Sequence, residues 1–299
     1  MNNILKEKII LPARKTIRDD AKIKKFYILP WLLSIIFLTA LLVYQSIYTY
    51  VVIFWNNQEE VLKKFLYFLE SDYWFHAIII WIIFILIYIL SIPIFEWWLI
   101  KYIDFKNKGT PISWSEAFWQ WLYKFLPLFE YNNIFSEFKI ISILNFYLFS
   151  IRFVGLDYIM VINYIFIIVF IVWLILNILF VYSKYAIVLN NKNVFESIWE
   201  SSKITILNLK RTIKLYFLIF FLNLRVIINF IIFLFFPIMI FVTIWLISTK
   251  FLLIIAITIL WIIFVWLILA LWYLTAVLEV FKTALWYYAY EEWKKYLEE

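Results

Sequence analysis

The chain of 299 residues is 67% hydrophobic and carries a formal net charge of +7. Soluble domains are only about 45–50% apolar, and a soluble fold of this size could not bury so much apolar surface, so the composition excludes an ordinary soluble protein. The chain has no cysteine, which excludes disulfides, thiolate chemistry and cysteine-based metal sites.

The first 25 residues are rich in lysine and arginine, and we expect them to form a basic cytoplasmic segment (1–25). An apolar run follows from Phe26 to about Trp55. This run is too long for the apolar part of a signal peptide, and no small-residue cleavage site follows it. We therefore expect it to be the first membrane-spanning helix.

A membrane-spanning helix needs about 20 mostly apolar residues. On this measure the sequence predicts an all-α fold, a polytopic bundle of about six spans in a membrane domain at 26–285. The spans are expected near 28–54, 76–100, 140–156, 158–183, 226–248 and 251–280. Two short outer turns are expected, a hairpin at Arg152–Asp157 that contains Gly155, and Thr249–Lys250. A charged cytoplasmic tail is expected at 286–299.

Most of the 27 basic residues fall in the ends and loops on one side of these spans. Loops that stay in the cytoplasm carry the excess of lysine and arginine. The pattern predicts a multi-pass protein of the inner cell membrane with both termini in the cytoplasm. Because the basic excess serves orientation, nucleic acid is not an expected partner.

Two amphipathic helices are expected on the inner side, near 113–126 and 193–213. Each begins with a capping-box pattern, Ser113 with Glu116 and Asn193 with Glu196. Pro127 is expected to stop or kink the first of them. The apolar face of the second is expected to hold Phe195, Ile198, Trp199, Ser202, Ile206, Leu209 and Ile213. Four cations lie largely off that face and are expected to contact anionic headgroups of the inner leaflet, namely Lys203, Lys210, Arg211 and Lys214.

The segments Glu116–Phe118, Glu196–Ser201 and Phe281–Tyr288 carry a resemblance to a known class. They resemble the Glu-Ala-x-x-x-Ser helix between spans, and the last-span ending, of uncharacterised bacterial six-span inner-membrane proteins. That class includes the membrane domain attached to some glycerophosphodiester phosphodiesterases. Ser197 stands where the class usually has alanine. The resemblance implies a membrane location and no settled activity.

No catalytic motif is present in the sequence. His76 is the only histidine, and its position beside Trp74 at the start of a span is typical of an interfacial residue. A phosphodiesterase would need clustered carboxylates and histidines, so the sequence predicts no enzyme, no metal and no cofactor. We expect a protein that acts through lipids, a protein partner or a homo-oligomer. The alternatives are a small-solute or lipid transporter or permease, and a membrane-embedded lipid-modifying enzyme.

Three ionisable residues lie within or beside predicted spans, where charge is costly and usually has a partner. They are Glu96, Arg225 and Glu279. We expect them to form an intramembrane charge cluster on the inner side. Such a cluster either fixes helix packing or takes part in transport.

The chain has 17 tryptophans and only 2 glycines. Glycine makes up about 7% of average proteins, and membrane helices usually contain more of it than soluble ones. Interfacial anchoring explains Trp31, Trp55 and Trp74 but not Trp261 or Trp266, which are expected deep in a span. One hypothesis is that some tryptophans are glycines encoded by UGA, in a lineage that reads this codon as glycine.

Overall fold

The computed structural model describes residues 5–20, 73–109, 125–134, 154–224 and 250–297, together with short stretches and single positions between them. All regular secondary structure in these residues is helical. The predicted all-α class is therefore confirmed. Most residues of the predicted spans near 28–54, 140–156 and 226–248 lie outside the described part of the chain.

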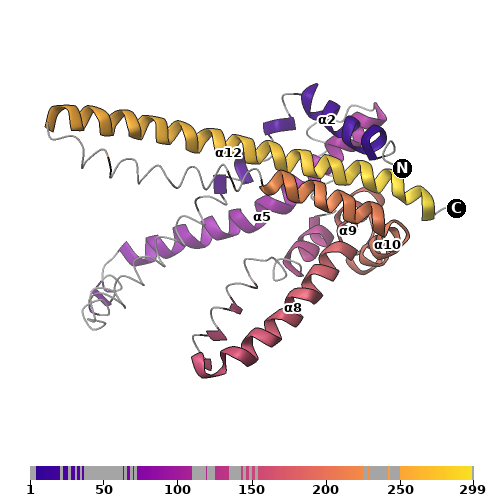
Figure 1. Cartoon of the computed structure of the whole chain (residues 1–299), viewed down its shortest axis with the longest axis horizontal. Helices are drawn as coiled ribbons and strands as arrows, with labels where there is room; N and C mark the ends of the chain where they lie inside the picture. Colours follow the sequence, from indigo (N-terminus) through magenta and orange to yellow (C-terminus); the bar gives the residue numbers. More distant parts are fainter. Residues whose placement is uncertain are drawn as a thin grey trace.

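Three long helices dominate the described structure. They are α5 (Tyr73–Lys108), α8 (Ile159–Leu179) and α12 (Lys250–Lys294), and they diverge from one end of the molecule (Figure 1). Two stretches among the described residues are long and apolar enough to cross a membrane, Tyr73–Lys108 and Ile159–Asn190. They match the spans predicted near 76–100 and 158–183. α12 begins at the predicted turn, and its 45 residues run beyond the predicted end of the sixth span.

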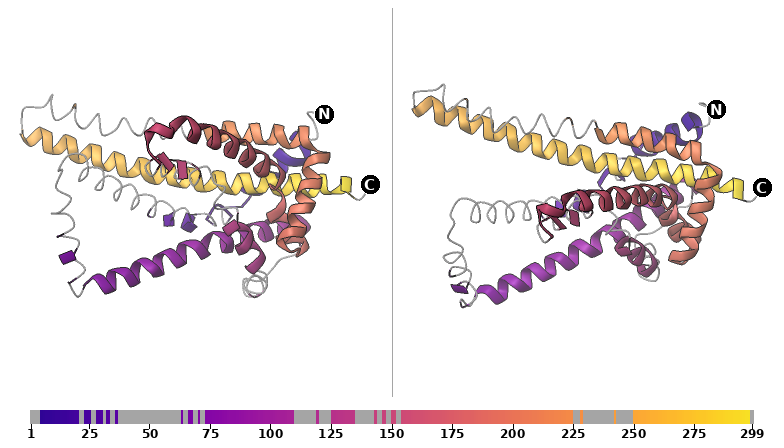
Figure 2. Two further views of the ribbon diagram at one scale, coloured as in Figure 1. Left: turned by 90° about the horizontal axis from the view of Figure 1, so that it is seen from below. Right: turned by 60° about the horizontal axis from the view of Figure 1, so that its bottom comes forward.

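The shorter elements gather at the end where the long helices meet, and both chain termini lie there (Figures 1 and 2). They are η1 (Leu5–Ile10), α2 (Leu11–Arg18), η2 (Ile23–Lys25), α9 (Ser183–Asn190), α10 (Val194–Leu207) and η5 (Lys295–Leu297), with helical segments at 125–134 and 209–224. Together with the adjoining ends of the long helices, we call this region the hub. Most of the buried apolar residues, such as Ile9, Ile100 and Tyr185, belong to it.

The long helices expose apolar side chains outside the hub. Ile80 of α5 is 66% exposed, Ile168 of α8 63% and Ile254 of α12 64%. Burial of apolar surface is the main favourable term in folding in water. The exposed apolar side chains of these helices therefore need an apolar environment that the described protein does not supply. Lipid chains provide it, because they are as apolar as the side chains they meet.

A tight hairpin precedes α8, at the place the sequence predicts. Gly155 has a φ of +93°, a conformation that glycine adopts without the steric cost of a Cβ. It is followed by η4 (Leu156–Tyr158). On the two sides of the turn, the Tyr147 hydroxyl donates to Asn163 Oδ1 at 2.7 Å, and the Tyr147 ring packs on Phe166. The two chain segments therefore run back along each other.

The boundaries of α10 follow its capping residues. Asn193 precedes the helix, and its N–H donates to Glu196 Oε2 at 3.4 Å, so the predicted capping box is present. The helix ends at Leu207, and Asn208 separates it from the helical segment 209–224. The stretch predicted as one helix to 213 is thus two. The other predicted inner helix, 113–126, lies almost wholly outside the described residues, although Pro127 is part of the helical segment 125–134.

Candidate functional site

A group of charged and polar side chains lies where α5, α9 and α12 enter the hub. We call it the inner polar cluster and define it as Glu96, Asn132, Lys184, Glu279 and Lys282. Glu96 Oε1 of α5 lies 3.3 Å from the Lys184 ammonium of α9, and Glu96 Oε2 accepts a hydrogen bond of 3.2 Å from Asn132 Nδ2. The side chains of Lys184 and Glu96 are 22% and 13% exposed.

The second carboxylate of the cluster comes from α12. Glu279 pairs with Lys282 one turn further on, and the Lys282 ammonium donates to Asn223 Oδ1 at 3.1 Å. Lys184 is also within electrostatic range of Glu279. The two glutamates singled out from the sequence therefore both belong to this region, each with a lysine partner. Arg225, the third predicted member, lies outside the described residues.

The lysine partners were missing from the predicted cluster because they were assigned to inner loops. One feature of the sequence could have identified these lysines, namely their position just beyond the apolar part of a predicted span. Glu96 lies 23 residues into α5, or ~35 Å at 1.5 Å per residue, and the apolar core of a bilayer is only ~30 Å thick. Measured from Tyr73, Glu96 therefore lies farther along α5 than that apolar core is thick.

A second network ties the end of α12 to three other helices. The Tyr287 hydroxyl donates to Asp104 Oδ1 of α5 at 2.9 Å. The hydroxyls of Tyr288 and Thr16 of α2 are 2.8 Å apart, and the Tyr290 hydroxyl donates to Glu200 Oε1 of α10 at 2.7 Å. Tyr287 and Tyr290 are fully buried. Residues 286–294, expected in a charged tail, thus continue α12 into the centre of the hub.

Glu200 is one of two buried carboxylates in this second network, the other being Asp104. Besides Tyr290, it accepts a hydrogen bond of 3.1 Å from Asn190 Nδ2, and its Oε2 lies 2.6 Å from the Lys192 ammonium. Burial, and next the negative charge of Glu200, raises the pKa of Tyr290 well above its ordinary value. The phenol consequently stays protonated and can donate to the carboxylate. The arrangement satisfies a buried charge, as a stable interior requires.

α10 turns its polar side to the protein and its apolar side outward. The buried side includes Ser197, Glu200, Ser201 and Thr205. On the outer side, Phe195 is 82% exposed, and Trp199 and Ile206 are each 65% exposed. These three residues belong to the apolar face predicted from the sequence, whereas Ile198, Ser202 and Ile213 are half-buried. Small hydroxyl side chains allow close approach to α8 and α9, which leaves the large apolar ones outside.

The four predicted headgroup contacts have different surroundings. Lys203, Lys210 and Lys214 are exposed, and the Lys203 ammonium lies 5.1 Å from the centre of the Trp199 ring. Arg211 instead donates to Asn208 Oδ1 at 2.9 Å and lies over the Tyr296 ring at 4.9 Å. The three lysines are therefore the cations available to a membrane surface.

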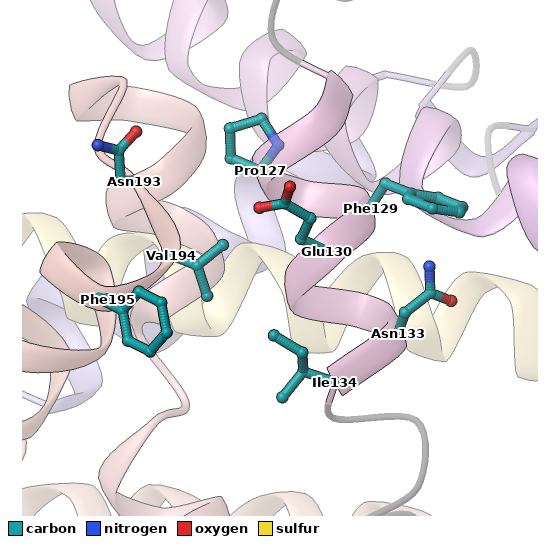
Figure 3. Close-up of a pocket in the computed structure, with 8 residues that line it drawn as sticks. All are labelled: Pro127, Phe129, Glu130, Asn133, Ile134, Asn193, Val194 and Phe195. Atoms are coloured by element: carbon teal, nitrogen blue, oxygen red, sulfur yellow. The ribbon is translucent and has the colours of Figure 1, made fainter.

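A pocket of about 480 Å³ opens between the segment 125–134 and the start of α10 (Figure 3). Pro127, Glu130 and Ile134 line one side, and Val194 and Phe195 the other. Its walls are mostly apolar, so it suits an apolar group better than a charged one. Within the described part of the chain, no three histidine, aspartate or glutamate side chains are grouped to hold a metal ion.

Comparison of the chain with protein-family models, curated proteins and solved structures finds no match. The resemblance to the bacterial six-span class therefore stays a prediction.

Proposed function

We propose that this is a six-span protein of the inner cell membrane, with both termini in the cytoplasm, that acts without catalysis through lipids or a protein partner. One observation carries the proposal. α10 directs its apolar side chains, among them Phe195 and Trp199, away from the protein, with the exposed cations Lys203, Lys210 and Lys214 beside or beyond them.

Such a division between apolar and basic surface is typical of a helix that lies in the headgroup plane. α10 lies in the hub, where the exposed apolar surfaces of α5 and α8 end. A membrane that covers these long helices therefore has its inner surface near α10. The basic loops and termini on the same side support the orientation.

Topology is testable with single cysteines, because the chain has none of its own. We expect Tyr158→Cys, in the exposed turn before α8, to react with a membrane-impermeant maleimide on intact cells. Arg14→Cys and Lys210→Cys should react only after the membrane is permeabilised. Labelling of Arg14→Cys on intact cells would disprove the proposed orientation.

The position of α10 needs its own measurement. An environment-sensitive fluorophore at Phe195→Cys should show blue-shifted emission in liposomes and be quenched by spin-labelled lipids. Arg14→Cys, at an exposed position of α2, is the matched control and should not be quenched. Equal quenching at the two positions would contradict a membrane-facing α10.

The inner polar cluster favours transport as a second candidate function. Its part-buried pair of Glu96 and Lys184 joins the two described stretches that are long and apolar enough to cross a membrane, Tyr73–Lys108 and Ile159–Asn190. Ionisable residues in such places often serve proton or ion movement. Under this candidate, Lys184→Met should abolish a flux or growth phenotype while the protein still assembles in the membrane. Loss of assembly without a specific loss of flux would show that the cluster stabilises helix packing and does not take part in transport.

A further inference from the structure

We propose that a basic pocket beside α10 binds the phosphate group of an anionic membrane lipid. The pocket has a volume of about 380 Å³ and lies between α10, the loop before it and the end of α12. The inference rests on the proposed membrane position of α10. It adds a specific headgroup site, whereas the proposed function requires only a membrane surface.

Three lysines reach this pocket from three different elements. Lys192 comes from the loop between α9 and α10, Lys203 from α10 and Lys294 from the last turn of α12. Their meeting depends on the tertiary fold, since Lys294 is far from the other two in sequence. Convergence of several ammonium groups on one pocket is the arrangement that a phosphate group needs.

The two carboxylates that line the pocket are already engaged. Glu200 accepts hydrogen bonds from Tyr290 and Asn190 and pairs with Lys192. Glu196 accepts from the Asn193 N–H at the start of α10. They therefore repel an incoming anion less than two free carboxylates would.

The lysines keep donors to spare. Each ammonium has three N–H groups, and those of Lys192 and Lys294 make one described contact apiece, to Glu200 and to Asn190 Oδ1. Lys203 contacts the face of the Trp199 ring, and within the described part of the chain no acid pairs with it. Lys203 is thus the lysine most available to a ligand.

The surroundings of the pocket favour a lipid over a soluble phosphate. Trp199 lines it and is also part of the outward apolar face of α10. A headgroup in the pocket would place its acyl chains against that face. Tryptophan is enriched at this depth of a membrane, where one end of the ring is apolar and the other polar.

The test uses the full-length protein, purified in detergent, and native mass spectrometry with added phosphatidylglycerol or phosphatidylcholine. We expect selective retention of phosphatidylglycerol, and Lys203→Gln should weaken it about fivefold, the factor that one lysine near an anionic surface contributes. Lys6→Gln, at an exposed lysine of η1 that does not line the pocket, is the matched control and should retain the lipid. Lys203→Arg should restore retention. Because Lys203 has no described ion pair, its loss should spare the fold, which thermal unfolding checks.

Three outcomes would overturn the inference. Equal losses in Lys203→Gln and Lys6→Gln would mean that diffuse charge, not the pocket, holds the lipid. Equal retention of both lipids would mean that the pocket does not distinguish an anionic headgroup from a zwitterionic one. Displacement of the lipid by inorganic phosphate at similar concentration would assign the pocket to a soluble phosphate. Extraction of the protein from membranes by alkaline carbonate tests the proposed function separately, so that the two failures are distinguishable.

Discussion

Single hydroxyl groups connect the helices of the hub. Tyr287, Tyr288 and Tyr290 follow one another near the end of α12, yet each bonds to a different helix, α5, α2 or α10. Consecutive positions on a helix point in different directions, so a short tyrosine-rich stretch can reach several neighbours. Hydrogen bonds of individual side chains therefore stabilise the hub, and removal of one hydroxyl group tests the contribution of each bond.

Tyr290→Phe removes the hydroxyl that donates to buried Glu200. We expect a loss of about 1–3 kcal/mol in the free energy of unfolding, because a buried charged acceptor loses one of its donors. Thermal unfolding in detergent measures the change. Tyr158→Phe, at a 58% exposed position, is the control and should unfold like the wild type. Equal stability of both variants would show that the Tyr290 bond contributes nothing.

The amino terminus is attached to α12 by an ion pair that depends on pH. Burial alone would raise the pKa of Glu292, but hydrogen bonds from Lys295 and Lys8 outweigh it and lower the pKa below 4.5. Its stabilisation is therefore present above pH 4.5 and lost as the pH falls through the lowered pKa. The same hydrogen bond raises the pKa of Lys8 above 10.5, so its stabilisation is lost only as the pH rises beyond that value.

We expect acid to release η1 and α2 from α12. Hydrogen exchange of residues 5–18 should accelerate as the pH is lowered from about 6 to about 3, after correction for the intrinsic exchange rate. Glu292→Gln should exchange faster already at the higher pH and respond less to acid. A wild-type profile without pH dependence would rule out the pair as the attachment.

The tryptophan hypothesis also belongs to single residues. Trp97, Trp173, Trp272 and Trp293 have buried indole N–H groups without an acceptor among the described residues, whereas buried tryptophans usually have one. If UGA is read as glycine, the intact mass of the natural protein falls by the tryptophan–glycine difference at each such codon. Mass spectrometry of the native protein measures this, and UGG codons at these positions would exclude the hypothesis.

Elements of the hub are joined through side chains that replace missing helix hydrogen bonds. α8 ends at Leu179 and α9 begins at Ser183, which leaves carbonyl and N–H groups without helical partners. Ser201 of α10 donates to the Leu179 carbonyl at 2.7 Å and accepts from the Tyr182 N–H at 3.0 Å. Thr205 of α10 also donates to the Leu179 carbonyl, at 3.3 Å, so two hydroxyl side chains of one helix complete the joint between α8 and the hub.

Ser201→Ala should destabilise the protein by about 1–3 kcal/mol, because the Tyr182 N–H loses its acceptor while the Leu179 carbonyl keeps the hydrogen bond from Thr205. Ser202→Ala is the matched control. Its hydroxyl bonds only to the Ile198 carbonyl within the same helix, so we expect little change. Unfolding in detergent distinguishes the two, and similar behaviour of both variants would refute the capping role of Ser201.

The whole molecule has a packed end and an open end. The described parts of α5 and α12 are exposed away from the hub and buried within it, whereas α8 is exposed along most of its length. The ion pair of Glu96 and Lys184 lies at the transition between these regions. It thus contributes to the angle at which the long helices leave the hub.

A double-mutant cycle measures this contribution. Lys184→Met should cost about 1–3 kcal/mol, because the part-buried Glu96 carboxylate loses its charged donor and keeps the hydrogen bond from Asn132. The double variant Glu96→Gln with Lys184→Met should recover part of that loss, since no buried charge remains unpaired. Additive losses would show that the pair does not couple α5 to α9.

Local features of the sequence correctly predicted two long helices and the start of α10, but not the ends of α10 and α12. Apolar runs of sufficient length gave α5 and α8, the acid three residues after Asn193 gave the start of α10, and Gly155 gave the hairpin, because hydropathy, capping and backbone φ are properties of neighbouring residues. Six spans, the cytoplasmic termini and the headgroup contacts stay predictions. Three features were visible only in the tertiary structure: the pair of Glu96 and Lys184, the inward polar side of α10, and the place of residues 286–294 in the hub. These features depend on contacts between residues up to 284 positions apart, as in Lys8 with Glu292, and local patterns do not encode which distant partners meet.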